Sequence, residues 1–212
     1  EPASQYQNIA KRKGVEKLTP ARAMIAELVR QYWVLGMECS LLEIQKLAWF
    51  LERAIEKQLT SRPGMKNPLN LQFEAHVYGP YADRLRHLLD HMDGSYLRPD
   101  KRISDSAPLD IIWFDDARKA YLQSYLESAE VQPYRQSLKD MLALIDGFES
   151  PFGMELLATI DWLMAKHNVA PTLEAIKQGI LDWPAGAQSA QRKARLFDDR
   201  SIQIALDRLM HS

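Results

Sequence analysis

The chain has 212 residues, 46% of them apolar, which is enough for one large or two small globular domains. Its 27 lysines and arginines nearly balance 28 aspartates and glutamates, so the chain lacks the overall basic field that most nucleic-acid binders carry. The single cysteine, Cys39, excludes an intramolecular disulfide and a cysteine-rich zinc module, and no stretch is apolar enough to span a membrane. We therefore expect a folded, cytoplasmic protein.

The first residues of the chain are polar and have a basic excess. Lys11, Arg12, Lys13 and Lys17 outnumber the acidic residues there, and no apolar signal core is present. We expect residues 1–17 to be a solvated linker from an absent upstream domain. A basic arm that binds nucleic acid is the alternative.

Two amphipathic helices are expected next. Thr19 is a favourable helix cap, and Pro20 fits the first helical position because its missing N–H has no partner there. Apolar residues then recur at helical spacing over residues 24–33. Ser40 is the expected cap of the second helix, in which the same spacing continues over residues 41–55.

A strand and a third helix are predicted in the following region. Residues 69–76 alternate between apolar and polar side chains, which is typical of a half-buried strand. Gly79 and Pro80 end that strand, because this dipeptide favours a turn. Helical spacing returns over residues 81–92.

The middle of the chain is less regular. Residues 95–110 contain two prolines, several charges and few apolar side chains, so they form a long loop or an irregular hairpin. Residues 109–114 are a short apolar run typical of a buried strand. Asp115 and Asp116 then indicate another helix start, one as the cap and the other through the helix dipole.

The rest of the chain is predicted to be helical. Helical spacing recurs over residues 134–145, 156–167, 173–180 and 202–209. The expected fold class is therefore mainly α: a compact multi-helix domain over residues 18–212 with a small two- or three-stranded sheet.

His87 and His91 are a candidate metal pair. They lie four residues apart on a predicted helix, a spacing that points both imidazoles at one ion. A metalloprotease needs a glutamate directly after the first histidine, and Leu88 stands there instead. We interpret the pair as histidines of a polar helix face and predict no bound metal, with a metal-dependent hydrolase as an alternative.

No enzyme motif is found in the sequence. Neither a Gly-x-Ser-x-Gly sequence nor a phosphate-binding glycine loop occurs. A helix amino terminus can lower the pKa of a thiol, but Cys39 is interpreted as a small apolar residue before a helix. We therefore expect no catalytic residue, no cofactor, no small-molecule substrate and no enzymatic activity in this chain.

A helix-turn-helix near the C-terminus provides an alternative function, that of a DNA-binding transcriptional regulator. A helix over residues 172–181 and another after Ala185 could place a basic face in the major groove. Asp182, Asp198 and Asp199 lie close by and would repel phosphates, so we do not favour this reading. The side chains that would face the groove are Gln188, Gln191, Arg192, Lys193 and Arg195.

Three stretches together resemble a known family. They are Leu18-Thr19-Pro20-Ala21-Arg22-Ala23, then residues 42–51 with the core Gln45-Lys46-Leu47, and then Tyr78-Gly79-Pro80-Tyr81-Ala82 continuing to Met92-Asp93-Gly94-Ser95-Tyr96. A weaker likeness lies in Trp183, Lys193, Phe197, Ile202, Ala205 and Leu209. By the order and spacing of these stretches, the chain resembles the C-terminal toxin-binding domain of the DarG-type antitoxins, in the SocA-related group of Panacea domains.

The resemblance implies a two-part antitoxin. An upstream macrodomain would remove ADP-ribose from thymidine in DNA, and the domain seen here would bind the DarT toxin, an NAD-dependent DNA ADP-ribosyltransferase. No macrodomain pattern occurs in this chain, so the resemblance implies that hydrolase activity belongs to another part of the protein.

The toxin contact is expected on the acidic segment at residues 96–116. Aspartates outnumber Lys101 and Arg102 there, and carboxylates on a projecting loop can imitate the phosphates of single-stranded DNA. The domain would then neutralise the toxin by occluding its DNA-binding groove. The residues predicted to bind the toxin are Tyr81, Arg84, His91, Tyr96, Arg98, Asp100, Lys101 and Asp105.

Overall fold

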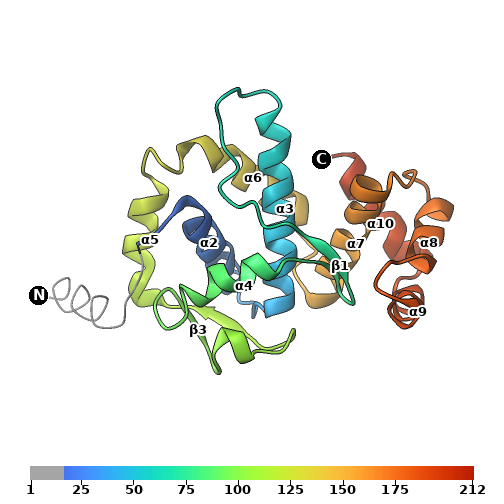
Figure 1. Ribbon diagram of the computed structural model, residues 1–212, viewed down its shortest axis with the longest axis horizontal. Helices are drawn as coiled ribbons and strands as arrows, with labels where there is room; N and C mark the ends of the chain where they lie inside the picture. Colours follow the sequence, from blue (N-terminus) through green and yellow to red (C-terminus); the bar gives the residue numbers. More distant parts are fainter. Residues whose placement is uncertain (1–16) are drawn as a thin grey trace, which may run out of the picture.

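The computed structural model describes residues 17–212. The predicted linker at residues 1–17, like the alternative basic arm, lies outside the described residues except for Lys17. The described part is mainly α with two antiparallel sheets of two strands each, so the expected fold class is confirmed. In Figure 1, helix α3 lies near the middle of an elongated molecule, and helices α8, α9 and α10 gather at one end.

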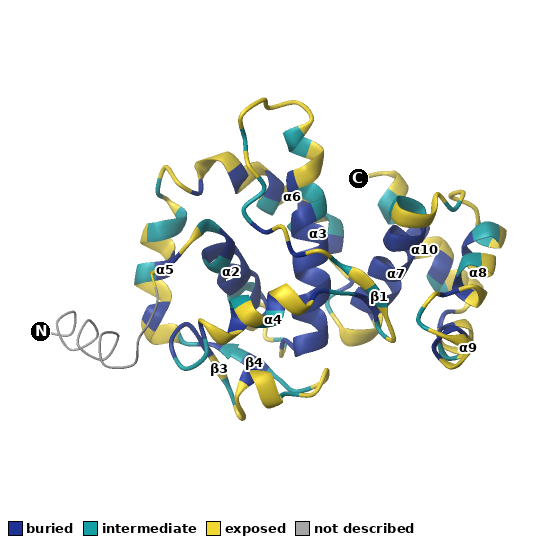
Figure 2. Cartoon of the chain, viewed as in Figure 1, coloured by how far each residue is buried: buried dark blue, intermediate teal, exposed yellow. Residues whose placement is uncertain are grey.

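Helices α2 (Pro20–Val34) and α3 (Leu41–Leu59) begin at the predicted caps. The Thr19 hydroxyl accepts a hydrogen bond from an amide of the first turn of α2. Ser40 and Glu43 form a capping box, in which each side chain pairs with the backbone of the other. Helix α3 is buried along most of its length, as the dark blue ribbon in Figure 2 shows, because α2, α6, α7 and β2 contact it.

Strands β1 (Glu74–His76) and β2 (Gly79–Tyr81) form an antiparallel hairpin that leads into α4 (Asp83–Asp90). Val77 and Tyr78 make the turn between the strands. The Gly-Pro pair therefore begins a second strand instead of ending the first one, and the predicted helix start at residue 81 was two residues early.

The predicted strand at residues 69–76 was too long. Its burial does alternate, with Leu69 and Leu71 buried and their neighbours exposed. However, Asn70 and Gln72 have φ values of 45° and 59°, which are incompatible with extended strand backbone. Only the last three residues of the segment pair as a strand.

Strands β3 (Leu97–Pro99) and β4 (Ile112–Phe114) pair antiparallel, so residues 95–110 belong to an irregular hairpin. A short 3-10 helix, η1 (Ile103–Asp105), interrupts its loop. The predicted strand at residues 109–114 starts later than expected, because backbone carbonyls of this loop accept hydrogen bonds from the first two amides of α3. The hairpin loop therefore satisfies the amino terminus of the central helix.

The remaining helices follow in chain order. They are η2 (Asp116–Arg118), α5 (Lys119–Leu126), η3 (Gln132–Tyr134), α6 (Arg135–Ile145), α7 (Pro151–His167), α8 (Leu173–Leu181), α9 (Ala187–Leu196) and α10 (Asp199–Met210). Side chains of Asp115, Ser150, Thr172 and Asp198 cap four of them. Helix α7 contacts α3, α8 and α10, so it joins the C-terminal helices to the rest of the fold. Within residues 17–212, no helix is both long and apolar enough to cross a membrane.

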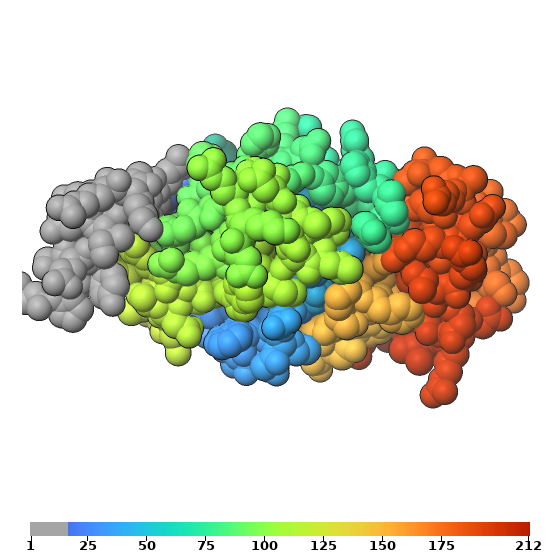
Figure 3. Space-filling model, turned by 90° about the horizontal axis from the view of Figure 1, so that it is seen from below, coloured from blue at the N-terminus to red at the C-terminus, as the bar shows by residue number. Residues whose placement is uncertain are grey.

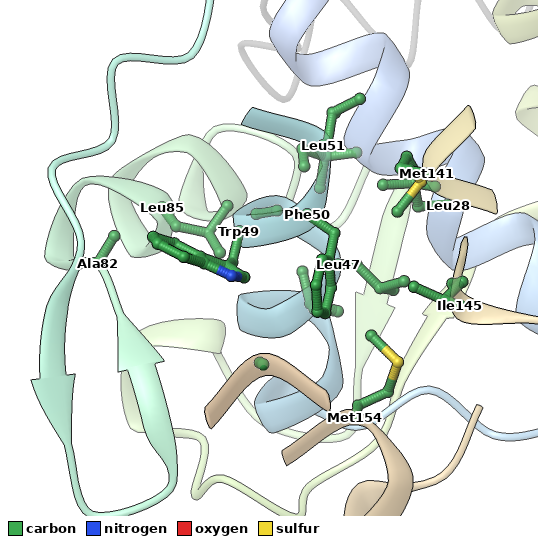
Figure 4. Packing of buried hydrophobic residues seen from close by; sticks show 14 of the residues in the cluster. Leu28, Leu47, Trp49, Phe50, Leu51, Ala82, Leu85, Met141, Ile145 and Met154 are labelled. Carbon is green, nitrogen blue, oxygen red and sulfur yellow. The ribbon is translucent and has the colours of Figure 1, made fainter. Parts of the chain in front are cut away.

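The hydrophobic core surrounds α3. Figure 4 shows Leu47, Phe50 and Leu51 of this helix among buried side chains that include Leu28 of α2 and Met141 of α6. Burying one such side chain contributes roughly 1.5–3 kcal/mol. The cluster therefore fixes the position of α3, on which the candidate site is built.

Candidate functional site

Gln45 of α3 fixes the backbone between β2 and α4. Its Nε2 donates a hydrogen bond to the Ala82 carbonyl oxygen at 3.1 Å, and the Ala82 amide donates one to its Oε1 at 2.9 Å. Both residues are buried, so each of these polar groups needs its partner. The side chain thus supplies the hydrogen bonds that a neighbouring strand would otherwise provide at this position.

Lys46, the next residue of α3, supports the hairpin from beneath. Its Nζ donates to the Pro80 carbonyl oxygen at 2.7 Å, and the residue is 2% exposed. Burial and the nearby charge of Lys193 lower the pKa of Lys46 to about 7. Among the described residues, no carboxylate lies within ion-pair distance of this ammonium group.

Gly79 lies directly over Lys46 and allows this close approach. A Cβ at residue 79 would stand 3.3 Å from Thr159 Oγ1 and 3.4 Å from Cε of Lys46. Gly79 also has a φ of 104°, a conformation that side chains disfavour. The Gln-Lys-Leu and Gly-Pro motifs, far apart in the sequence, are therefore in direct contact.

A buried ionic cluster lies beside Lys46 and joins α7 to α9. Glu155 Oε1 accepts hydrogen bonds from Arg192 at 2.6 Å and from Lys193 at 2.8 Å. Arg192 also lies over the ring of Tyr78, 4.7 Å from its centroid, and Lys193 lies over Trp183 at 4.9 Å. Burial by itself raises the pKa of the Glu155 carboxyl. The hydrogen bonds and charges of Arg192 and Lys193 outweigh this effect and hold that pKa below its usual value.

This cluster weakens the interpretation of α9 as a DNA-recognition helix. Lys193 is 0% exposed, and the Arg192 guanidinium is engaged with Glu155 and Tyr78. Both cations are therefore engaged in ion pairs and ring contacts within the fold instead of with a phosphate backbone. Gln188, Gln191 and Arg195 remain exposed.

Beside the hairpin, a pocket of about 240 Å³ opens between the start of α3, α4 and the loop before β4. Its apolar walls include Leu41, Leu42 and Pro108. An aromatic wall consists of Tyr81 and His76, whose rings stack with centroids 4.5 Å apart. Figure 3 shows the face of the molecule on which the teal and green hairpin adjoins the yellow-green loop.

The predicted contact residues on the hairpin and α4 differ in their surroundings. Tyr81 is half-buried in the pocket wall. Arg84 is exposed and donates to the Asn70 carbonyl oxygen at 3.0 Å. His91 is the exposed residue at the C-terminal end of α4.

Tyr96 is not on a projecting loop, contrary to the arrangement we expected. It is 8% exposed and belongs to the hydrophobic core, with Arg118 5.9 Å from the centroid of its ring. Burial raises the pKa of its hydroxyl. The reason lies in the fold: Tyr96 stands directly before β3, whose pairing with β4 turns this residue inward.

The other predicted contact residues do lie on the surface. Arg98 forms an ion pair with Asp115 at 2.7 Å, and Lys101 Nζ lies 3.5 Å from an oxygen of Asp110. Asp100 and Asp105 are exposed. The structure thus brings Arg98, Asp100, Lys101 and Asp105 together on the β3–β4 hairpin.

Two minor alternatives can be compared with the structure. Within the described residues, no group of three or more histidine, cysteine, aspartate or glutamate side chains is arranged to hold a metal ion. Cys39 is 2% exposed, and burial raises the pKa of its thiol well above the ordinary value. A reactive thiolate is therefore disfavoured at this position.

Sequence reasoning missed the ionic cluster around Glu155. A signal was available, because Glu155 stands between Met154 and Leu156 in a helix whose neighbouring turns are apolar on every side. A charged residue at such a position is buried only when it is paired. The sequence could not show that the partners come from α9.

No family model matches the chain. Three curated relatives are named DNA ADP-ribosyl glycohydrolase. Those from Mycobacterium bovis and Mycobacterium tuberculosis are each 31% identical over 214 residues, which cover 93% of this chain and 55% of the relative. The relative from Thermus aquaticus is 31% identical over 194 residues, covering 92% of this chain and 47% of its own length. The chain thus spans about half the length of the curated relatives it matches.

The name of these relatives corrects one expectation. We expected no enzymatic activity in the chain because its sequence contains no catalytic motif. Relatives that align with 93% of the chain are named as enzymes, which contradicts this expectation. The absence of a local motif was a weak argument, because catalytic groups are brought together by folding and need not be neighbours in sequence. Over most of its length, this chain is a homologue of the proteins named DNA ADP-ribosyl glycohydrolase.

Proposed function

We propose that this chain belongs to a DNA ADP-ribosyl glycohydrolase that serves as an antitoxin, and that its β3–β4 hairpin binds a DarT-type toxin. The first part of the proposal is supported by the three relatives of that name. The second part follows the resemblance to the DarG-type antitoxins and the geometry of the hairpin. A cytoplasmic location fits both parts and stays a prediction.

The observation that supports toxin binding is a pre-formed acidic loop. Asp100 and Asp105 are exposed, while the ion pairs Arg98–Asp115 and Lys101–Asp110 join the two sides of the hairpin. The Asp93 carboxylate also accepts a hydrogen bond from the Ile103 amide at 2.9 Å, which fixes the start of η1. A loop that is already ordered loses little conformational entropy on binding, so its contacts contribute more fully to affinity.

The mechanism that we propose is occlusion by charge complementarity. A toxin that modifies DNA needs a basic groove for the strand, and exposed carboxylates at a fixed spacing can occupy that groove in place of phosphates. The buried Tyr96 is not available for stacking, so the mimicry would depend on carboxylates more than on aromatic rings. Association should accordingly weaken as the salt concentration rises.

Charge reversal tests the hairpin as the contact. We expect Asp100→Lys combined with Asp105→Lys to weaken binding to a coexpressed DarT-type toxin at least tenfold by calorimetry. The matched control is Glu127→Lys combined with Asp140→Lys, which makes the same change in net charge at exposed positions directly after α5 and within α6. If both double variants bind equally well, general electrostatic attraction explains the association and the hairpin is not the contact.

The enzymatic part of the proposal needs its own measurement. The relatives are named for the release of ADP-ribose from DNA. Chromatography can detect this release from an ADP-ribosylated oligonucleotide that is incubated with this chain as the only protein. Because this assay contains no toxin, its result is separate from the binding test.

A further inference from the structure

The pocket beside the β1–β2 hairpin has the properties of a ligand site, and the exposed carboxylates Asp100 and Asp105 proposed to bind the toxin do not line it. Its volume of about 240 Å³ is somewhat smaller than the roughly 300 Å³ at which pockets for drug-sized ligands begin. A compact ligand, or one unit of a larger ligand, would therefore fill it.

The walls of the pocket suit a flat ring. The stacked pair of His76 and Tyr81 presents an aromatic surface, with the two rings inclined by only 28°. Leu41, Leu42 and Pro108 line the pocket with apolar groups. Aromatic surfaces of this kind hold nucleobases by stacking, and each stacked base is worth roughly 1–3 kcal/mol.

The polar groups of the pocket favour an anion. Lys46, Arg86 and His76 line it, whereas no aspartate or glutamate of the described residues does. Arg86 is held in place, because Nη2 donates to the Ser104 carbonyl oxygen at 2.7 Å and Nη1 lies 3.5 Å from the Tyr81 hydroxyl. Lys46 is a buried amine whose hydrogen-bond partner is the neutral Pro80 carbonyl, so an entering anion would supply the counter-charge that this amine lacks.

We propose that this pocket binds a nucleotide unit, with the base against the His76–Tyr81 pair and the phosphate near Arg86 and Lys46. The inference rests on the pocket and does not depend on toxin binding. A free nucleotide and a nucleotide of single-stranded DNA share this chemistry, and the two sources can be separated experimentally.

Calorimetry of the full chain with AMP at low salt tests the proposal directly, with adenosine as the ligand that lacks the phosphate. We expect AMP to bind at least tenfold more tightly than adenosine. Arg86→Gln should weaken AMP binding at least tenfold. Arg84→Gln is the matched control, because Arg84 is an exposed arginine of the same helix that does not line the pocket, and this variant should bind AMP as the unchanged chain does.

A second ligand identifies the source of the nucleotide. If Arg86→Gln weakens binding of AMP, the pocket accepts a free nucleotide; if it weakens binding of a 12-nucleotide single strand of DNA but AMP does not bind, the pocket accepts a nucleotide within a strand. The proposal is overturned if neither AMP nor the oligonucleotide binds. It is also overturned if a ligand binds but Arg86→Gln leaves its affinity unchanged.

NMR keeps the test independent of how well the variants fold. With AMP or the oligonucleotide added to the unchanged chain, we expect the largest amide shift changes at residues 76–81 and 104–108. Shift changes confined to other parts of the chain would also overturn the proposal. If the pocket receives an acidic side chain of the toxin instead, Arg86→Gln will weaken toxin binding while neither nucleotide ligand binds.

Discussion

Two regions of the molecule differ in whether their paired polar side chains are buried or exposed. The first is the contact between α3 and the β1–β2 hairpin, and the second is the β3–β4 hairpin. At the first, Gln45 and Lys46 are buried and pair with the backbone of residues 80 and 82. At the second, Arg98 and Lys101 are exposed and pair with carboxylates across the hairpin. The first region contains the motifs by which the family resemblance is recognised, yet its side chains are largely unavailable to a partner. A recognisable motif can therefore mark a structural junction within the fold.

Removing the amide of Gln45 should have the largest effect on stability. Gln45→Ala leaves the buried Ala82 N–H without a partner, and an unpaired buried group costs roughly 1–3 kcal/mol. The variant also removes one of two hydrogen bonds to the Ala82 carbonyl oxygen, which still accepts one from the Leu85 amide. We expect a loss of about 3 kcal/mol in the free energy of unfolding, measured by urea denaturation. The control Gln123→Ala changes an exposed glutamine of α5 and should cost less than about 0.5 kcal/mol. Equal effects of the two variants would contradict the structural role assigned to Gln45.

Two glycines test the close packing of the first region. Gly79→Ala introduces both an unfavourable φ and contacts with Thr159 and Lys46, so we expect a loss of about 2 kcal/mol. Gly94→Ala, just before the second hairpin, meets the same backbone problem at φ 75° but no atom within 4 Å of the new Cβ. It should cost only about 1 kcal/mol, the backbone part alone. Thermal unfolding of both variants measures the difference, which vanishes if the hairpin can move away from α3.

The buried amine of Lys46 should make stability depend on pH. Its pKa is about 7 in the folded chain and about 10.4 in an unfolded one. Between these values the unfolded chain binds a proton that the folded chain does not, so the free energy of unfolding rises with pH in this window. Relative to Lys46→Met, we expect the unchanged chain to gain on the order of 2 kcal/mol between pH 7 and pH 9. Parallel pH curves for the two proteins would show that Lys46 keeps an ordinary pKa.

Breaking the surface ion pair should have the smallest effect. Arg98→Ala removes the pair with Asp115, whose arginine is more than half exposed. Exposed pairs contribute between 0 and about 1 kcal/mol, so unfolding by urea should change by less than about 1 kcal/mol. A loss as large as that of Gln45→Ala would mean that the second hairpin is as tightly coupled to the core as the first region.

Local patterns predicted the helices well and the strands poorly. Thr19, Ser40 and Ser150 act as caps because capping depends only on neighbouring residues. The strand at residues 69–76 was overextended because alternation reports burial and not backbone pairing, and the positive φ values of Asn70 and Gln72 have no signal in the sequence. Tyr96 was placed on the surface because it begins the acidic segment at residues 96–116, whereas in the structure it is buried in the hydrophobic core.

The sequence by itself determined the helical fold class, the helix starts at Thr19 and Ser40, and the kinship with the DNA ADP-ribosyl glycohydrolases, because these depend on local spacing and on the order of motifs. Only the tertiary structure decided which charges are buried and which are exposed. Lys46, Glu155 and Lys193 belong to three different helices, and their burial follows from tertiary packing that no local pattern encodes. The same packing forms the pocket beside the hairpin, whose walls come from four separate segments of the chain.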